Sequence, residues 1–144
     1  MKVVVQRSLE SSVLVDGNIV GSINSGFVLL VCMETGDTLS NVEKAAEKLS
    51  KLRIFEDENQ KMNLSIQDVK GEALIISQFT LSWDGRKGNR PSFDFSLSPD
   101  KAQELFSQFC EKMRSFCSVA TGRFGADMKV SILNDGPVTF HFEF

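Results

Sequence analysis

Residues 71–81 read GEALIISQFTL and join a core strand to an abruptly polar end. The first half, Ala73–Ile76, is a continuous apolar run, which is typical of a strand buried on both faces. Ser77, Gln78 and Thr80 then place polar groups at the end of that strand. Buried polar groups are costly unless they are paired, so a ligand or a neighbouring chain could meet them here. The alternative is a core strand that ends in a loop whose hydroxyl groups are satisfied internally.

The composition is that of one soluble globular domain, which we expect to span residues 1–144. Of the 144 residues, 42% are hydrophobic and 24% are charged, an ordinary balance for such a domain. No apolar run approaches the length of a membrane span. The first eight residues, MKVVVQRS, lack the long apolar region of a signal peptide. These features predict a cytoplasmic protein that does not enter a membrane.

The cysteines argue against a disulfide-bonded or zinc-binding protein, and the net charge argues against a protein that binds nucleic acid over its whole surface. The three cysteines form no CxxC pair, which favours reduced thiols over a disulfide frame or a zinc site. They are Cys32, Cys110 and Cys117. The net charge is −3, so any contact with nucleic acid has to be local.

Hydrophobic periodicity predicts a single α+β domain with many strands and two main helices. The expected strands are residues 2–6, 12–15, 18–23, 27–32, 71–81, 128–133 and 138–144, with a mixed strand or turn at 61–69. A first helix is expected from the helical spacing of the apolar residues Val42, Ala45, Ala46, Leu49 and Leu52. Its candidate N-caps are Asp37, Thr38 and Ser40, and Ser40 with Glu43 has the spacing of a capping box. The second helix has a clear start, because Ser98 is a good cap and Pro99 suits the first helical position.

Residues 82–95 form the longest irregular stretch, and loops of this length in a compact domain are often functional. The stretch carries three cations within five residues, Arg86, Lys87 and Arg90. A local positive patch of this kind suits contacts with phosphate groups. A solvated flexible loop is the alternative interpretation.

Catalysis by side chains has little support in the sequence. The chain contains no GxSxG, Walker or HExxH pattern. His141 is the only histidine, and it lies on the polar side of the last strand, where a surface role is more common than that of a base. Ser77 and Thr80 could act as nucleophiles only with a base beside them, and no local carboxylate is obvious.

Catalysis by the backbone is better supported. Gly136-Pro137 is a place where the chain can adopt an unusual geometry and present carbonyl oxygens in a rigid array. Backbone N–H groups at the end of the strand near Ser77 and Thr80 could stabilise a developing oxyanion. The alternative is an ordinary turn with a proline in an edge strand.

Two motifs resemble the signature pair of the D-aminoacyl-tRNA deacylases. They are SQFTL at residues 77–81 and NDGPVT at residues 134–139. Both occur in order in a chain of the family's length, and similar segments cover the whole chain. These segments are Gln6-Arg7 and residues 52–55, 61–63, 86–88, 90–93 and 121–127.

The resemblance implies a homodimer with a barrel-like mixed or antiparallel sheet and active sites at the subunit interface. Gly136 and Pro137 would be joined by a cis bond and would reach into the partner's pocket. Their carbonyl groups would capture the α-amino group of the substrate and exclude an L-side chain. Arg7 would help to hold this corner. Asn134 and Val138, which flank it, would belong to the substrate-binding set.

The resemblance also implies an activity, the hydrolysis of the ester that joins a D-amino acid, or glycine, to the 3′ end of tRNA. The N–H groups near Phe79 and Thr80 would hold the ester carbonyl, while Ser77 and Gln78 would line the pocket. Water would attack with help from the 2′-hydroxyl of the terminal adenosine, and Thr80 as a covalent nucleophile is an older alternative. No metal or organic cofactor is implied.

Two other functions remain open from the sequence. One is a non-catalytic tRNA- or RNA-binding dimer that uses Arg86, Lys87 and Arg90 on phosphate groups. The other is a purely structural dimer closed by the Gly-Pro turn. Residues 82–85, SWDG, differ from the sequence that is more common in the family. The family's contacts in this loop are therefore not expected at these residues. A sister family edits L-alanine with altered motifs, and the unaltered SQFTL argues against it.

Overall fold

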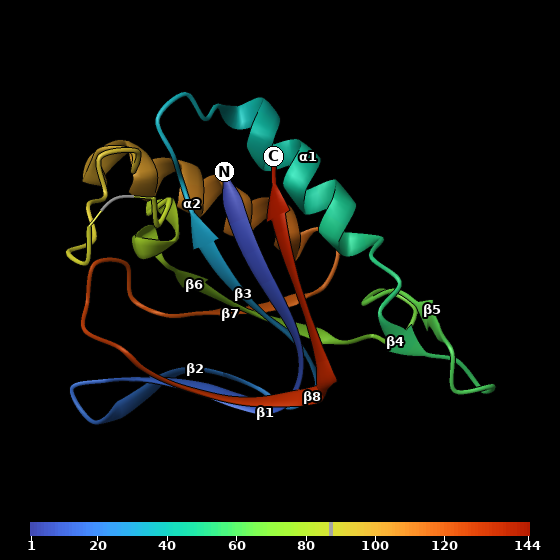
Figure 1. The fold of residues 1–144 in the computed structure, drawn as a ribbon. Coiled ribbons are helices and arrows are strands. Elements are labelled where there is room, and N and C mark those ends of the chain that lie inside the picture. The colour runs from blue at the N-terminus through green and yellow to red at the C-terminus, as the bar shows by residue number, and fades with distance from the viewer. Residues whose placement is uncertain (87) are drawn as a thin grey trace.

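A bent six-stranded sheet carries two helices on one face, and a small two-stranded arm projects from its edge (Figure 1). The computed structural model describes residues 1–86 and 88–144. The strands of the large sheet are β1 (Lys2–Val15), β2 (Asn18–Ile23), β3 (Gly26–Cys32), β6 (Glu72–Ser77), β7 (Ser118–Thr121) and β8 (Lys129–Glu143). The other elements are α1 (Leu39–Ser50), β4 (Phe55–Glu56), β5 (Met62–Leu64), the 3-10 turn η1 (Phe79–Ser82) and α2 (Pro99–Arg114).

The strand β6 is central, as its apolar run predicts. It pairs in parallel with β3 on one side and β7 on the other. Its four inner residues, Ala73–Ile76, are buried. Because both faces of the strand are covered, residues on opposite faces of β6 belong to two different cores.

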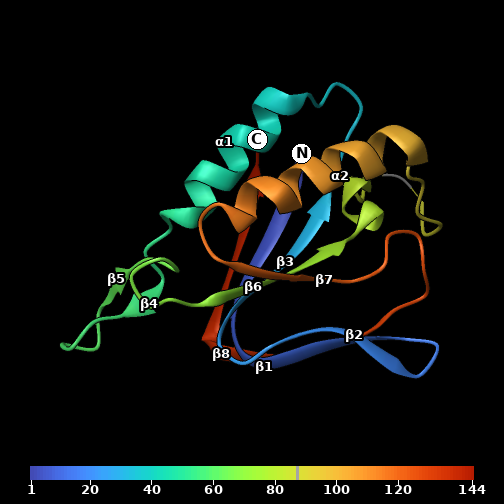
Figure 2. The same cartoon turned by 180° about the vertical axis from the view of Figure 1, so that it is seen from behind.

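The long strands β1 and β8 bend together and give the sheet its barrel-like curve. The first half of β1 lies between β3 and β8, whereas the second half lies between β2 and β8. Figure 2 shows the helices on one side of the sheet and the folded-over β1, β2 and β8 segments on the other. The larger core lies under the helices around Phe27 and Phe109, and the smaller one lies inside the curve around Val28 and Leu74.

The expected strands differ from the structure at β1, β6 and β8, and β4 and β7 are missed. The strand expected at residues 71–81 ends at Ser77, because the chain then turns into η1. The predicted strands at residues 2–6 and 12–15 are halves of β1, and those at 128–133 and 138–144 are halves of β8. Each pair of halves is continuous, because the β1–β8 register shifts at the bend without ending the ladder. The strand β7 is missed because its four residues carry no alternating pattern.

The helices agree with the sequence except at one cap. The helix α2 begins at Pro99 with Ser98 as its N-cap, which confirms the prediction. The helix α1 has Thr38, one of its three predicted N-caps, as its N-cap, so the expected Ser40–Glu43 box is wrong. The N–H of Thr38 donates to Asn41 Oδ1 at 2.9 Å, which closes the same kind of box two residues earlier.

Candidate functional site

The polar end of β6 turns sharply into η1 beside β3. The N–H of Gln78 donates to the Val31 carbonyl of β3 at 2.7 Å. Cys32 Sγ lies 3.4 Å from the Phe79 carbonyl oxygen, to which the thiol donates. The chain then leaves the sheet, so the side chains of Gln78 to Thr80 no longer follow the strand. The turn therefore places this signature at a rim of the sheet.

The backbone N–H groups of Phe79 and Thr80 stand at the start of η1, where an oxygen from outside the chain could bind them. The first N–H groups of a helical turn have no acceptor within that turn. In the part of the chain that the structure describes, no turn or loop carbonyl accepts a hydrogen bond from either group. Thr80 Oγ1 itself accepts a hydrogen bond from Gln78 Nε2. An amide N–H cannot take a proton from the hydroxyl group, so this contact does not activate Thr80 as a nucleophile.

An apolar cavity of about 470 Å³ opens beside this turn. Its walls come from β3, the end of β6, the segment 93–99 and α2. The lining residues are Val31, Met33, Ser77, Gln78, Phe79, Phe93, Ser96, Leu97, Ser98, Pro99, Ala102, Phe106, Phe124 and Gly125. The rings of Phe79 and Phe93 meet edge to face with centroids 4.9 Å apart. A cavity with aromatic walls and a few polar groups at one end suits a flat organic ligand such as a nucleobase.

The second signature lies at the bend of β8, where Gly136 and Pro137 are exposed. The bond between them is cis, and Gly136 has a φ of +116° that favours glycine. We call these two residues the Gly136–Pro137 corner. Asn134 Nδ2 donates to Thr139 Oγ1 at 3.0 Å and spans the corner from one side to the other. Val138, which follows the corner, is half-buried against the larger core.

Arg7 lies directly behind the corner and is only 6% exposed. Its Nε lies 2.9 Å from Asp135 Oδ2 and 3.4 Å from the Asp135 carbonyl oxygen. Nη1 donates to the Ile54 carbonyl at 2.9 Å, and Nη2 lies 3.5 Å from Glu56 Oε1. The guanidinium group thus joins the bend of β8 to the start of the β4–β5 arm.

The two signatures lie far apart within one chain. Arg7, beside the corner, pairs with Phe27 of β3, and Phe27 pairs with Ala73 of β6. Ser77 lies four residues farther along β6, which corresponds to roughly 13 Å. The strands β1 and β3 also separate β8 from β6 in the sheet. The structure therefore brings Ser77, Gln78 and Phe79 together in one place and the residues around Arg7 in another.

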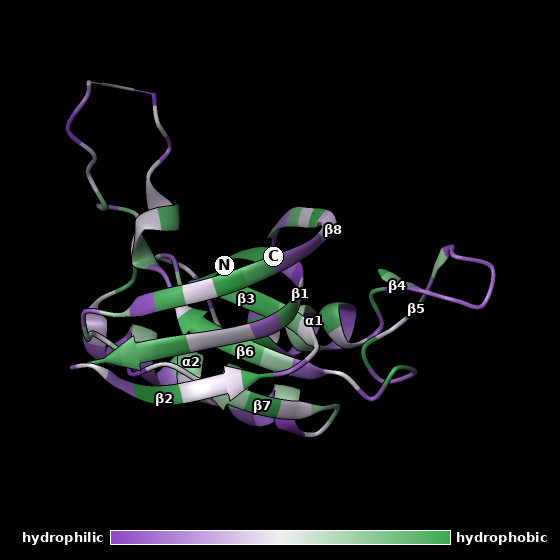
Figure 3. Cartoon of the chain, turned by 90° about the horizontal axis from the view of Figure 1, so that it is seen from below, coloured by the Kyte–Doolittle hydropathy of each residue, from purple (hydrophilic) through white to green (hydrophobic). Residues whose placement is uncertain are grey.

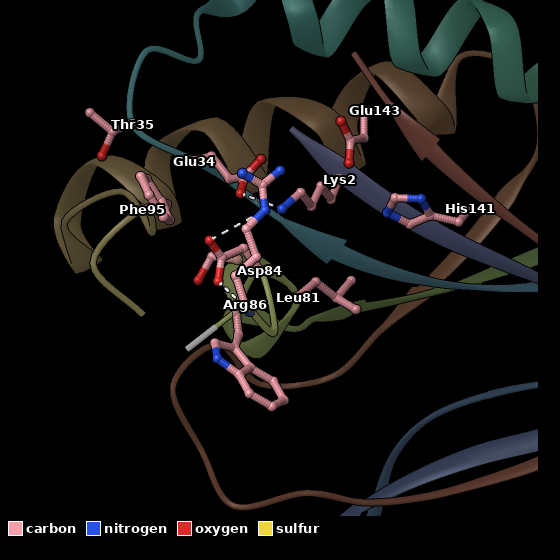
Figure 4. A pocket seen from close by; sticks show the side chains of 11 residues that line it. Lys2, Glu34, Thr35, Leu81, Asp84, Arg86, Phe95, His141 and Glu143 are labelled. Carbon is pink, nitrogen blue, oxygen red and sulfur yellow. Dashed lines mark hydrogen bonds and ion pairs between the residues drawn. The ribbon is translucent and has the colours of Figure 1, made fainter. Parts of the chain in front are cut away.

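A charged groove of about 550 Å³ lies on the other side of η1 (Figure 4). Trp83, Phe95 and His141 are among its walls. Lys2 Nζ lies 2.9 Å from Glu34 Oε1, and this hydrogen bond raises the pKa of Lys2.

Two basic residues of the loop next to this groove are exposed to solvent. The side chain of Arg86 is 84% exposed, and its Nε lies 3.9 Å from Asp84 Oδ2. Arg90 is also exposed. Lys87, the third predicted cation of this loop, lies outside the described residues.

The family described as D-Tyr-tRNA(Tyr) deacylase matches residues 4–143. The chain belongs to this family. A deacylase is a hydrolase, so the chain is an enzyme, as the resemblance of its two motifs implies. Both signatures and the aromatic cavity lie inside the matched residues.

Curated relatives named D-aminoacyl-tRNA deacylase match over nearly the full chain. The deacylase of Sulfurihydrogenibium sp. is 53% identical over 140 residues, covering 97% of this chain and 95% of its own length. The deacylase of Persephonella marina is 52% identical over 140 residues, with the same two shares.

Two solved structures share the fold of this deacylase. One is described as c-Myc DNA Unwinding Element Binding Protein, with a TM-score of 0.96 and 38% identity over 100% of this chain and 99% of the other. The second, described as a probable eukaryotic D-amino acid tRNA deacylase, has a TM-score of 0.81 and 18% identity over 98% of this chain and 97% of the other. At that identity the second structure supports the fold alone.

The sequence does not predict several residues of the candidate site. Asp135 and Glu56 contact Arg7 from segments that are distant in sequence, and a charged residue in a turn carries no local signal of such a role. Phe93 and Phe124 line the cavity. Both lie in segments that resemble the family, at residues 90–93 and 121–127, and this resemblance was the available signal.

Two further features bear on cofactors and membranes. Among the described residues, no three histidine, cysteine or acidic side chains gather as metal ligands would. The described helices include none whose length and hydropathy would let it cross a membrane.

Proposed function

We propose that this enzyme hydrolyses the ester bond of D-aminoacyl-tRNA and releases a free D-amino acid and tRNA. The observation that carries the proposal is the identity of about half of all residues with curated D-aminoacyl-tRNA deacylases over 97% of the chain. Backbone groups at both signatures take part in the reaction. They are the N–H groups of Phe79 and Thr80 at one signature and the carbonyl groups of the Gly136–Pro137 corner at the other.

In this proposal the aromatic cavity holds the terminal adenosine of the tRNA. The base lies among Phe79, Phe93 and Phe124, because aromatic walls stack on any base. Ser77 and Gln78 line the same cavity near the ester. The N–H groups of Phe79 and Thr80 hold the ester carbonyl oxygen and stabilise the negative charge that develops on it.

The Gly136–Pro137 corner selects the chirality and comes from a second copy of the chain. Within one chain the corner lies about four residues along the sheet and three strands away from Ser77. The corner is nevertheless exposed, and Arg7 supports it through Asp135. A group that reaches into another subunit needs both exposure and such support. A homodimer that brings the corner of one subunit to the cavity of the other satisfies both observations.

The carbonyl oxygens of the corner accept hydrogen bonds from the α-amino group of the substrate. With the amino group and the ester both fixed, the side chain of an L-residue points into the corner, whereas that of a D-residue points away. Glycine has no side chain to reject, so glycine mischarged onto tRNA is a second substrate. Asn134 and Val138 hold the two ends of the corner in place.

Water is the attacking nucleophile, assisted by the 2′-hydroxyl of the terminal adenosine. No described imidazole or carboxylate contacts Thr80 Oγ1, which accepts a hydrogen bond from Gln78 instead. A nucleophilic threonine needs a base to take its proton, so the covalent route ranks below the water route.

The loop with Arg86, Lys87 and Arg90 contacts tRNA phosphate groups in this proposal. Arg86 and Arg90 are exposed and available for such contacts. Charged tRNA is used where translation takes place, which for this enzyme we propose to be the cytoplasm.

Nucleic-acid binding by this enzyme, separate from hydrolysis, is the second candidate function, because the exposed Arg86 and Arg90 would serve it equally well. The relative with 38% identity carries a name that describes DNA-element binding.

The decisive experiment measures the release of D-tyrosine and of L-tyrosine from charged tRNA, side by side with a control without enzyme. Fast release of the D-residue with the L-ester untouched establishes the chiral esterase. Binding of tRNA without release of either residue would contradict the proposed hydrolysis and leave nucleic-acid binding as the supported function.

Subunit complementation tests whether the corner acts across the dimer. Gly136→Ala alters the corner, and Ser77→Phe fills the cavity of its own subunit. In a mixed dimer, one site combines an intact cavity with an intact corner only if the two come from different subunits. Recovered activity on mixing two inactive variants supports the proposal, and no recovery in a proven mixed dimer would contradict it.

A further inference from the structure

The β4–β5 arm is tied to the active corner through one buried cation. Figure 3 shows the arm extending away from the body of the molecule, on the side opposite the long polar loop. Its first residues nevertheless contact Arg7, through the Ile54 carbonyl at 2.9 Å and the Glu56 carboxylate at 3.5 Å. The same guanidinium group contacts Asp135 at 2.9 Å. Arg7 therefore connects the arm to the residue that precedes Gly136.

The position of Glu56 follows from the packing of its neighbour. Phe55 is buried, and its ring stacks on that of Phe27 with centroids 6.3 Å apart and planes inclined by 28°. Phe27 is the residue of β3 that pairs with Arg7 of β1. Because Phe55 is anchored in the core beside this pair, the next side chain along the arm reaches the guanidinium group.

The corner needs side-chain support because the ladder is interrupted there. The β1–β8 register shifts on both sides of the pair Ser8–Asn134. At such an irregularity, regular ladder bonds no longer define the direction of the backbone. The guanidinium group of Arg7 is close enough to do so, since a Cβ atom at Gly136 would lie 3.0 Å from Nη2.

We propose that Asp135 and Glu56 are positioning residues that act through Arg7 to direct the Gly136–Pro137 carbonyl groups and thereby set the selection against L-aminoacyl esters. The inference rests on the proposed function and adds two residues that neither signature assigns to chirality. Asp135 has the stronger effect, because its contact is shorter and lies on the corner itself. Glu56 has the weaker effect, because its carboxylate is 52% exposed and solvent screens the pair.

The test compares Asp135→Asn and Glu56→Gln with Asp127→Asn as a matched control. Asp127 also lies near β8 and pairs with a cation, Lys129, but at the start of that strand, away from the bend that carries the corner. All three changes remove one negative charge and keep the size of the side chain. The quantity measured is the ratio of kcat/KM for D-tyrosyl-tRNA to that for L-tyrosyl-tRNA.

We expect the D-to-L ratio to fall about tenfold or more in Asp135→Asn and about threefold in Glu56→Gln, while Asp127→Asn stays at the wild-type value. The double variant should fall by less than the product of the single effects, since both residues act on Arg7. An unchanged ratio, or an equal loss on both esters, would overturn the inference, because a merely structural defect lowers both rates together.

A readout without substrate separates this inference from the proposed function. Amide hydrogen exchange of residues 134–136 and 138 should speed up about tenfold in Asp135→Asn, whereas the amides of Ala73–Ile76 in β6 should not change. If the wild-type enzyme releases no D-tyrosine but exchange responds in this way, the proposed function fails and the positioning stands. Unchanged exchange at the corner would sink the positioning, whatever the activity.

Discussion

A Cβ atom at Gly136 would lie 3.0 Å from Arg7 Nη2 and 2.7 Å from Val138 Cγ2. The φ of Gly136, +116°, is also one that side chains rarely adopt. We therefore expect Gly136→Ala to displace the corner and to lower kcat/KM for D-tyrosyl-tRNA by about 100-fold. The loss in folding free energy should be about 1–3 kcal/mol, measured by urea unfolding.

The matched control for this change is Gly36→Ala. Gly36 also has a positive φ, +99°, but nothing lies within 4 Å of an added Cβ atom. The control should lose a similar amount of stability and keep full activity. If both variants lose activity equally, the close packing of the corner is not what matters.

Removing the Thr80 hydroxyl separates the two mechanisms. Thr80→Val keeps the shape of the side chain and deletes an oxygen that accepts a bond from Gln78. With water as the nucleophile, kcat/KM for the D-ester should stay within about tenfold of the wild-type value. Ser77→Ala should behave in the same way. A loss of about 1,000-fold or more in Thr80→Val, with normal folding and tRNA binding, would favour covalent catalysis.

Phe79 offers a test of the aromatic cavity, since its side chain is already 57% exposed in the chain. Phe79→Ala should change the folding free energy by less than about 0.5 kcal/mol. The loss of a stacked base should raise the KM for charged tRNA about tenfold. Phe95→Ala is the control, because Phe95 is equally exposed at 58% but lines the charged groove instead. Equal effects of the two changes on KM would place the base elsewhere.

The basic loop predicts a salt dependence of tRNA binding. Each of Arg86→Gln and Arg90→Gln should lower the slope of log affinity against log salt by about 1. Titration of labelled tRNA at several salt concentrations measures this slope. Lys51→Gln makes the same charge change in a residue that pairs with Glu47 at the end of α1, and it should leave the slope unaltered. If Lys51→Gln lowered the slope as much as the arginine variants do, the slope would depend on net charge alone and not on contacts of this loop.

Burial raises the pKa of the Cys110 thiol to about 12, from a usual value of 9.0. The unfolded chain loses this proton first, so raising the pH above 9 stabilises the unfolded state relative to the native one. The contribution of Cys110 to stability is therefore complete below pH 9 and is lost as the pH rises toward 12. Urea unfolding at pH 8 and pH 11, under reducing conditions, should show a smaller drop for Cys110→Ala than for the wild type. The chain has no tyrosine to titrate in this range. Equal drops would mean that this thiol already ionises in the folded protein.

The sequence predicts those elements whose residue pattern depends only on neighbouring residues, such as β6 and the start of α2. The apolar run of β6 is buried on both faces, as a central parallel strand requires. Ser98 and Pro99 start α2 because capping depends on a few adjacent residues. The sequence predicts strand ends at the bends of β1 and β8, because polar or glycine-containing residues interrupt the alternating pattern at a bend and at a strand end alike. Pairing with a bent partner is what keeps each strand continuous.

The sequence by itself determined the family, through SQFTL and NDGPVT, and the chemical groups that the site has available. Only the tertiary structure decided which of these groups meet. It placed the corner well away from Ser77, and it gathered Ile54, Glu56 and Asp135 around Arg7. Periodicity and capping are properties of neighbouring residues, whereas these contacts join segments 47 to 128 positions apart. Such contacts form only when the sheet bends and the arm packs on Phe27. A pattern of neighbouring residues therefore cannot predict them.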